Sequence, residues 1–242
     1  MTEEPFRWLE AVAQRREYVR DQLRDATPVF AVALPEGILL LGVGQGGTKV
    51  FEVHDRHALA ALGHPSDIER IRQAAIDAAH VEAFTRSAED LSLRRLVGFG
   101  LSPVLKQAFE QLHSAPVLAE FVFAELGTAA EGDRLARLRS DGGFEVTSGV
   151  AVAAPDGEAA LEAWLRKALA GVADPRVAAD RCLTAWAAHE ARKDLGAVDP
   201  AAPGLDWRDS LAGRRVEAAM LWRRGTGNVR FAVLPEGWPE AR

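Results

Sequence analysis

The sequence has one cysteine, Cys182, among its 242 residues. A single thiol cannot form an internal disulfide, so the fold must be stable without one, as is usual in a reducing cytoplasm. Cys182 lies in a stretch with helical spacing, which indicates a buried structural thiol. We therefore expect a cytoplasmic protein.

Long apolar runs are also missing. None approaches the roughly 20 residues that a membrane-spanning helix needs. The first residues, MTEEPFRWLEAVAQRR, start acidic and have no apolar centre, unlike a signal peptide. The formal net charge is −6, so the chain as a whole does not attract nucleic acid. Neither a membrane nor a nucleic acid is expected as a partner.

Lysine is scarce: of 29 basic residues only four are lysines, namely Lys49, Lys106, Lys167 and Lys193. Lys49 stands at the start of an expected core strand, where a β-branched residue would suit the sheet better. This position suggests a function for Lys49, and the alternative is a solvated lysine at a strand end.

What the sequence does contain is a series of short apolar segments between residues 28 and 63, PVFAVALPEGILLLGVGQGGTKVFEVHDRHALAALG. Turn residues separate them, which predicts strands at 29–34, 38–43, 49–53 and 57–62. Strands this short, in series, predict a meander. Because the first two runs are apolar on both faces, we expect a sheet that is covered on both sides.

Apolar residues at three- and four-residue steps predict helices at 5–24, 65–86, 87–113, 156–169 and 174–186. Ser87 and Asp90 would form a capping box, and Asp174 would cap the last of these helices. A bend is expected where helix-breaking residues interrupt the third helix, at Gly98, Gly100 and Pro103.

The first helix has an apolar stripe formed by Phe6, Leu9, Val12, Val19 and Leu23. This stripe packs either on the helix's own domain or on a neighbouring subunit. Further strands are predicted at 117–126, 134–139 (edge-like), 144–154, 216–222 and 229–234, with a hairpin loop at 225–228. The whole order predicts an α+β fold with four layers, an αββα sandwich.

Two motifs in the sequence, a glycine-rich segment and a pair of histidines, do not indicate a binding site. Residues 42–47 read GVGQGG, but they lie between two strands and not between a strand and a helix, as a phosphate loop requires. His54 and His57 are close in sequence, but a three-residue step in a strand puts them on opposite sides. We interpret these histidines as surface or satisfied residues, and expect no metal site and no cofactor.

One nucleophilic arrangement stays open. Thr27 directly precedes the first strand, and Lys49 starts the third. A threonine at a chain terminus can use its own amine as base, with a lysine lowering the pKa. Such a site requires cleavage before Thr27.

The ordered series of segments resembles the proteasome family, in particular the bacterial α-type subunits. VFAVALPEGILLLG is similar to the opening hairpin, FVFAELG to the V-A-E strand and VEAAMLWRRGTGNVRFAVLPE to the closing hairpin. TKVFEVHDRHALAALGH is similar to a further family segment, with Lys49, Val53, Asp55 and Gly63 in register. The resemblance covers about residues 20–235 and implies an Ntn-hydrolase fold. It divides the chain into an N-terminal helix that serves assembly, residues 1–25, and a proteasome-type αββα domain, residues 26–242.

The resemblance also implies a choice between two kinds of subunit. Catalytic β subunits use an N-terminal threonine, an aspartate after the second strand and a lysine that starts the third. Lys49 and Thr27 match, but Ala26 precedes the threonine, Pro28 follows it, and no acid lies at residues 43–44. A helix precedes the first strand, as in α subunits. We expect a non-catalytic α-type subunit, and the alternative is a self-processing threonine peptidase of the β-type or ancestral β family that uses Thr27 and Lys49.

As an α-type subunit, the chain would form a homo-heptameric ring that caps β rings, gates substrate entry and docks an activator ATPase ring. Its partners would be β-type subunits, neighbouring α subunits and the ATPase ring. Lys49 would pair with the C-terminal carboxylate of the activator in a pocket between α subunits, and Ala26 and His64 would line that pocket. A stand-alone binding domain is the third interpretation.

Overall fold

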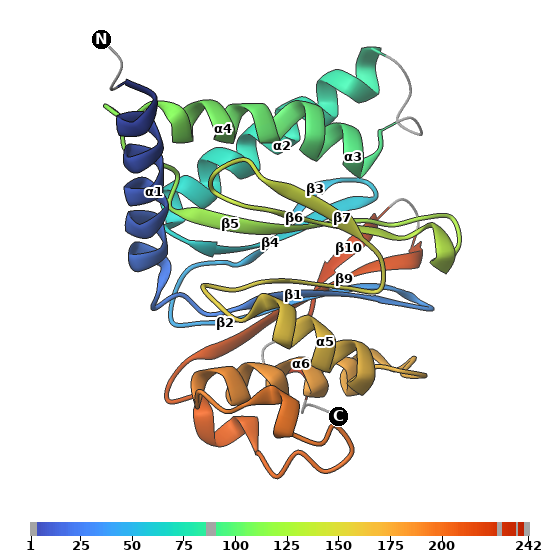
Figure 1. Ribbon diagram of the computed structural model, residues 1–242. Coiled ribbons are helices and arrows are strands. Elements are labelled where there is room, and N and C mark those ends of the chain that lie inside the picture. Colours follow the sequence, from blue (N-terminus) through green and yellow to red (C-terminus); the bar gives the residue numbers. More distant parts are fainter. Residues whose placement is uncertain (1–3, 86–90, 227–228, 236, 240–242) are drawn as a thin grey trace.

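The computed structural model describes residues 4–85, 91–226, 229–235 and 237–239. Its layers run helices, sheet, sheet, helices, and α1 (Glu4–Leu23) stands across one end of both sheets (Figure 1). The described strands form two antiparallel five-stranded sheets, ordered β10-β9-β2-β1-β8 and β3-β4-β5-β6-β7. The predicted α+β class and αββα sandwich are confirmed.

The first sheet consists of β1 (Val29–Leu34), β2 (Gly37–Gly44), β8 (Val150–Ala153), β9 (Arg215–Thr226) and β10 (Val229–Val233). The second sheet consists of β3 (Val50–His54), β4 (His57–Gly63), β5 (Ala119–Glu125), β6 (Arg134–Leu138) and β7 (Phe144–Thr147). The second sheet is covered by α2 (Pro65–Thr85), α3 (Leu93–Arg95), the π-helix η1 (Leu96–Leu101) and α4 (Ser102–Glu110). The first sheet is covered by α5 (Glu158–Ala168) and α6 (Pro175–Glu190). Short 3₁₀ turns are η2 (Ala130–Gly132), η3 (Leu195–Ala197) and η4 (Trp207–Ser210).

Both faces of the first sheet are buried, as the apolar runs predict. Along β1, Phe30 and Val32 pack toward α5 and α6, while Val29 and Ala31 pack between the two sheets. This alternation follows from the two-residue period of a strand. Each face therefore needs apolar residues, which explains why the run shows no polar positions.

The predicted meander of four strands is wrong. β1 pairs with β2 in the first sheet, whereas β3 pairs with β4 in the second. Residues 45–48 between the two hairpins are exposed, and there the chain passes from one sheet to the other. Local periodicity identifies strands but does not identify the sheet in which each one pairs.

The segment predicted as a single strand, 144–154, is two strands. Gly149 has a φ of +82°, a conformation that favours glycine, and it lies between β7 in the second sheet and β8 in the first. The edge assignment at 134–139 is also wrong, because β6 pairs with β5 on one side and with β7 on the other.

The helices agree with the sequence in outline. Asp174 caps α6, because its side chain accepts a hydrogen bond from the Arg176 amide. The proposed capping box of Ser87 and Asp90 lies outside the described residues, and the cap seen at α3 is Ser92. The expected interruption is the π-helix η1, which contains two of the predicted helix-breaking residues, Gly98 and Gly100, and precedes the third, Pro103.

The helix α1 packs on its own domain. Val19 and Leu23 are buried in the core between the sheets. Arg15 donates hydrogen bonds to the carbonyl oxygens of Ala108, at 3.1 Å, and Ser114, at 2.8 Å. The C-terminal half of α1 is therefore held by apolar contacts, and polar contacts reach the end of α4.

The apolar stripe of α1 is not buried along its whole length. Leu9 is 64% exposed, and Trp8 and Tyr18 are also exposed. Phe6 belonged to the predicted stripe, but its side chain lies outside the described part of the chain. The first turns of α1 thus present apolar side chains that their own domain does not cover.

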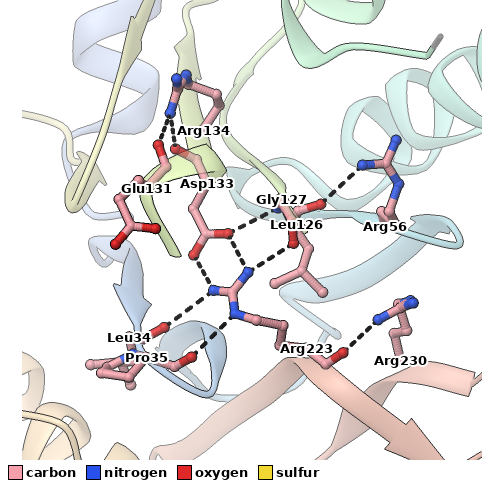
Figure 2. A network of polar contacts seen from close by, with 10 residues as sticks. All are labelled: Leu34, Pro35, Arg56, Leu126, Gly127, Glu131, Asp133, Arg134, Arg223 and Arg230. Atoms are coloured by element: carbon pink, nitrogen blue, oxygen red, sulfur yellow. Dashed lines mark hydrogen bonds and ion pairs between the residues drawn. The ribbon is translucent and has the colours of Figure 1, made fainter. Parts of the chain in front are cut away.

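The other end of the sandwich is closed by a polar network (Figure 2). Arg223 on β9 forms a two-point ion pair with Asp133, at 2.7 and 3.0 Å, and its Nε donates to the carbonyl of Pro35. Asp133 is 1% exposed and also accepts from the amide of Gly127. The network joins the β1–β2 turn and β9 of the first sheet to the β5–β6 loop of the second.

Within the described ranges, no helix combines the length and the apolar character that crossing a membrane requires.

Candidate functional site

Lys49 is the last residue before β3, which begins one position later than predicted. Its amide donates a 2.6 Å hydrogen bond to the Glu217 carboxylate on β9, and its carbonyl accepts from the amide of Ala61, at 2.9 Å. One partner belongs to each sheet. The backbone of Lys49 is thereby fixed where the chain enters the second sheet.

The Lys49 side chain lies along two glycines of β2. A Cβ at Gly44 would come within 2.8 Å of the Lys49 Cε, and a Cβ at Gly42 within 3.0 Å of its Cδ. Packed atoms do not approach this closely. These glycines belong to the GVGQGG segment. Because they have no side chains, they leave space for the Lys49 side chain to lie along β2.

Burial lowers the pKa of the Lys49 ammonium, the nearby Glu217 carboxylate raises it, and Arg214 lowers it again. Glu217 bonds to the backbone amide and not to the ammonium. Among the described residues no carboxylate forms an ion pair with the ammonium. An anion that approached this group would favour its charged form.

A pocket of about 270 Å³ lies beside Lys49. It is lined by Gly47, Thr48, Lys49, Phe51, Gly63, Pro65, Ile68 and Glu69. The lining combines one cation and one carboxylate with apolar side chains. It includes the residues on both sides of His64, but neither His64 nor Ala26 is among the lining residues.

His64 lies at the N-terminus of α2. Its carbonyl accepts from the amides of Asp67 and Ile68, both at 3.0 Å, and its Nδ1 is 2.8 Å from the Ser66 hydroxyl. The imidazole is exposed. It is therefore available at the surface next to the pocket, and its backbone caps the helix.

Thr27 is buried, and its hydroxyl donates to the carbonyl of Val43. The neighbouring Ala26 ends the turn after α1, since its amide donates to the Leu23 carbonyl at 2.9 Å. The amine of Thr27 is a peptide nitrogen in this chain. The hydroxyl thus meets a backbone oxygen of residues 43–44, where the sequence has no acid.

The prediction that His54 and His57 lie on opposite sides of a strand is wrong, and so is the interpretation of His57 as a surface or satisfied residue. His54 and His57 are directly opposite each other in the β3–β4 hairpin, and opposite residues of a hairpin share a face. His57 is buried, and neither ring nitrogen has a hydrogen-bond partner among the residues that the structure describes, so it is neither a surface nor a satisfied histidine. In the part of the chain that the structure describes, no group of three or more potential ligands could hold a metal.

Cys182 is buried in α6, as predicted, and burial raises the pKa of its thiol. Sequence reasoning missed Glu217 and Arg214. Glu217 lies within a correctly predicted strand, but only the pairing of β2 with β9 brings it to Lys49. No local pattern contains that information.

Comparisons with known proteins agree with the fold. No family model matches the chain. The proteasome subunit alpha of Paenarthrobacter aurescens is 30% identical over 148 residues, which cover 57% of this chain and 61% of the relative. That of Nocardioides sp. is 31% identical over 145 residues (57% and 56%), and that of Actinosynnema mirum is 32% identical over 130 residues (53% and 49%).

The matched part thus spans between 49% and 61% of the length of these curated relatives. These three relatives carry the same name, and the four-layer fold with a helix before its first strand is consistent with them. The chain is therefore a distant homologue of bacterial proteasome α subunits.

Proposed function

We propose that the chain is a non-catalytic α-type subunit of a bacterial proteasome. It forms the outer heptameric ring, gates substrate entry and docks an activator ATPase, so that it acts in cytoplasmic protein degradation. The observation that carries the proposal is the Lys49 ammonium, which is largely buried beside a pocket and forms no ion pair among the described residues, in a homologue of proteins named proteasome subunit alpha.

The anion that Lys49 lacks would come from the activator. A C-terminal carboxylate in the pocket forms a charge-assisted hydrogen bond with the ammonium, while Phe51 and Ile68 offer apolar contacts to the last residues of the activator. His64 at the pocket rim and Ala26 at the end of α1 are the proposed additional contacts. A neighbouring α subunit in the ring completes the pocket.

The absence of catalysis is part of the proposal. An N-terminal threonine nucleophile needs a free amine, an acidic partner and a lysine. No acid lies at residues 43–44, and the Thr27 hydroxyl bonds to the Val43 carbonyl. The positions of Thr27 and Lys49 support the alternative, a self-processing threonine peptidase.

Residues 1–25 serve assembly in this proposal, and residues 26–242 form the αββα domain. The exposed Trp8, Leu9 and Tyr18 of α1 are available to a β-type subunit or to the next subunit of the ring. Burying such side chains stabilises an interface by about 25 cal/mol per Å² of apolar surface. Leu9→Gln should weaken assembly without opening the domain core, because Leu9 is exposed.

Co-expression with a β-type subunit from the same genome tests the proposal. Native mass spectrometry should find the chain in a ring complex with β. A species near 26.2 kDa at micromolar concentration would instead support a stand-alone binding domain. Loss of residues 1–26 in the intact mass, with peptide hydrolysis that Thr27→Ala abolishes, would establish the threonine peptidase.

A further inference from the structure

The carboxyl group of Glu120 lies next to apolar core residues. On β5 it shares a face with Val122 and Ala124, which belong to the core between the two sheets. Its Oε2 atom is buried and has no hydrogen-bond partner in the described part of the chain. A buried carboxylate oxygen without a partner is costly, so this environment favours the neutral acid.

Glu120 also lines a pocket of about 780 Å³ beneath α1. One wall of this pocket is α1 itself, through Arg16, Val19, Arg20 and Leu23. The β6–β7 turn and the segment that leads into α5 form the remaining walls. If α1 moved away, Glu120 would face water.

Charged groups reach this pocket from three elements. They are Arg16 and Arg20 of α1, Arg139 and Asp141 after β6, and Asp156 and Glu158 before and within α5. Burial and the Glu158 carboxylate raise the pKa of Glu120 to about 7, against the opposing effect of Arg139 and Arg137 and with a small further increase from Asp141.

We propose that Glu120 is a proton-controlled contact beneath α1, which holds the helix against the sandwich while the carboxyl is protonated and loosens it when the carboxyl ionises. Wherever α1 keeps water from Glu120, it disfavours the charged form of the carboxyl, so ionisation opposes docking by the part of the desolvation that the helix supplies. Other contacts, such as Arg16 with Asp141 at 3.4 Å, limit how far the helix is released.

The direction of the pH dependence of α1 docking follows from the pKa of Glu120 in the exposed and in the docked state. An exposed glutamate titrates near 4.5, and the docked one near 7. Docking of α1 is therefore strongest below pH 4.5 and weakens as the pH rises to about 7. Above that pH both forms are ionised, and no further weakening occurs.

Hydrogen exchange of the α1 amides between pH 5 and 8.5 tests this inference. Wild type and Glu120→Gln, which keeps the shape and stays neutral, are compared at the same pH so that intrinsic exchange rates cancel. The opening of α1 in wild type, relative to the variant, should rise by up to about tenfold per pH unit and level off near pH 7. Glu158→Gln should lower the pH of that plateau, because it removes a carboxylate that raises the Glu120 pKa.

Equal α1 protection in wild type and Glu120→Gln at every pH would overturn the proposal. So would a variant whose α1 is loose throughout, since Glu120 would then be structural and not a proton sensor. Amides of β4 and β5 serve as the internal reference. A parallel change in those strands would show that the whole domain loosens, which also contradicts a local contact.

Discussion

The backbone amide of Lys49 donates its hydrogen bond to Glu217 across 168 positions of sequence. This carboxylate is thus bound to the main chain of the lysine, and among the described residues none forms an ion pair with the ammonium. The field of Glu217 still raises the pKa of Lys49, against the larger lowering effect of burial. Glu217 therefore helps to keep the ammonium charged, and the ammonium remains open to an external anion.

Glu217→Gln tests this relationship. Glutamine still accepts the hydrogen bond from the Lys49 amide but has no charge, so the pKa of Lys49 should fall below its wild-type value. Lysine-selective NMR can follow the titration, and with four lysines in the chain the Lys49 signal is assigned by its loss in Lys49→Ala. An unchanged or higher pKa would contradict the electrostatic role of Glu217.

Lys49→Ala should weaken binding of an activator's C-terminal peptide. A hydrogen bond to a charged group contributes roughly 1.5–3 kcal/mol, which corresponds to about a ten- to hundredfold loss of affinity. Lys106→Ala is the matched control, because Lys106 is exposed and pairs with Glu110 on α4. Fluorescence anisotropy with the free-acid peptide and its C-terminal amide measures both changes.

Lys49→Arg should recover only part of that affinity, since a planar guanidinium does not replace a compact ammonium. Equal affinity of wild type and Lys49→Ala for the free-acid peptide would make the anchor assignment wrong. A Lys49→Ala protein that fails to fold would instead identify the lysine as structural.

Gly44→Ala should displace the Lys49 side chain, because the new methyl group would lie 2.8 Å from its Cε. Peptide affinity should fall about as far as in Lys49→Ala, while the far-UV circular dichroism stays at the wild-type level. Gly46→Ala, where a Cβ meets nothing within 4 Å, is the control and should bind normally. Normal peptide binding by Gly44→Ala would mean that Lys49 does not need the space beside Gly44 to bind the carboxylate.

The sequence predicts most elements and one residue of the candidate site. Lys49 is identifiable because lysine is rare in this chain and this one precedes a core strand. Glu217 is not, because its approach depends on the β2–β9 pairing, which brings Gly42 opposite Glu217. The false meander has the same origin: each hairpin is local, but the choice of sheet depends on contacts with distant strands.

The same limit applies to His54 and His57. If residues 54–57 formed one strand, the three-residue step would place the two histidines on opposite faces. In the structure a tight turn separates two strands, and both histidines lie on the same face. Turn residues Asp55 and Arg56 are therefore as informative as the histidines themselves. The Arg223–Asp133 pair shows no local signal, because its partners are 90 positions apart.

Asp133→Ala should strongly destabilise the fold. The ion pair with Arg223 is enclosed, with side-chain exposures of 1% and 15%, and removing one partner leaves a charge without compensation. The expected loss is about 3–5 kcal/mol in the free energy of unfolding, measured by urea denaturation.

Adding Arg223→Met to Asp133→Ala should restore part of this loss, because the uncompensated guanidinium is then gone. Glu110→Ala breaks the exposed pair with Lys106 and should cost about 0–1 kcal/mol. A loss below about 1 kcal/mol for Asp133→Ala would mean that the network in Figure 2 does not hold the two sheets together.

His57 should make the fold sensitive to acid. It is 1% exposed, and burial, together with Arg56 and His54, lowers its pKa from 6.5 to about 3. The unfolded chain takes up this proton near pH 6.5, but the folded chain does not until about pH 3. The stability from neutral His57 is therefore complete above pH 6.5 and is lost as the pH falls toward 3, by up to about 1.4 kcal/mol per pH unit.

His57→Leu removes this titration and the two unpartnered nitrogens, so at pH 7.5 the variant should be about as stable as wild type. Below pH 6.5 wild type should lose stability faster than the variant, and the difference between the two urea curves isolates His57 from the other titrating groups. His113→Gln, at an exposed site, should follow wild type. If wild type and His57→Leu lose stability in parallel between pH 6.5 and 4, His57 takes up its proton in the folded state, and its ring must reach solvent or an acceptor on acidification.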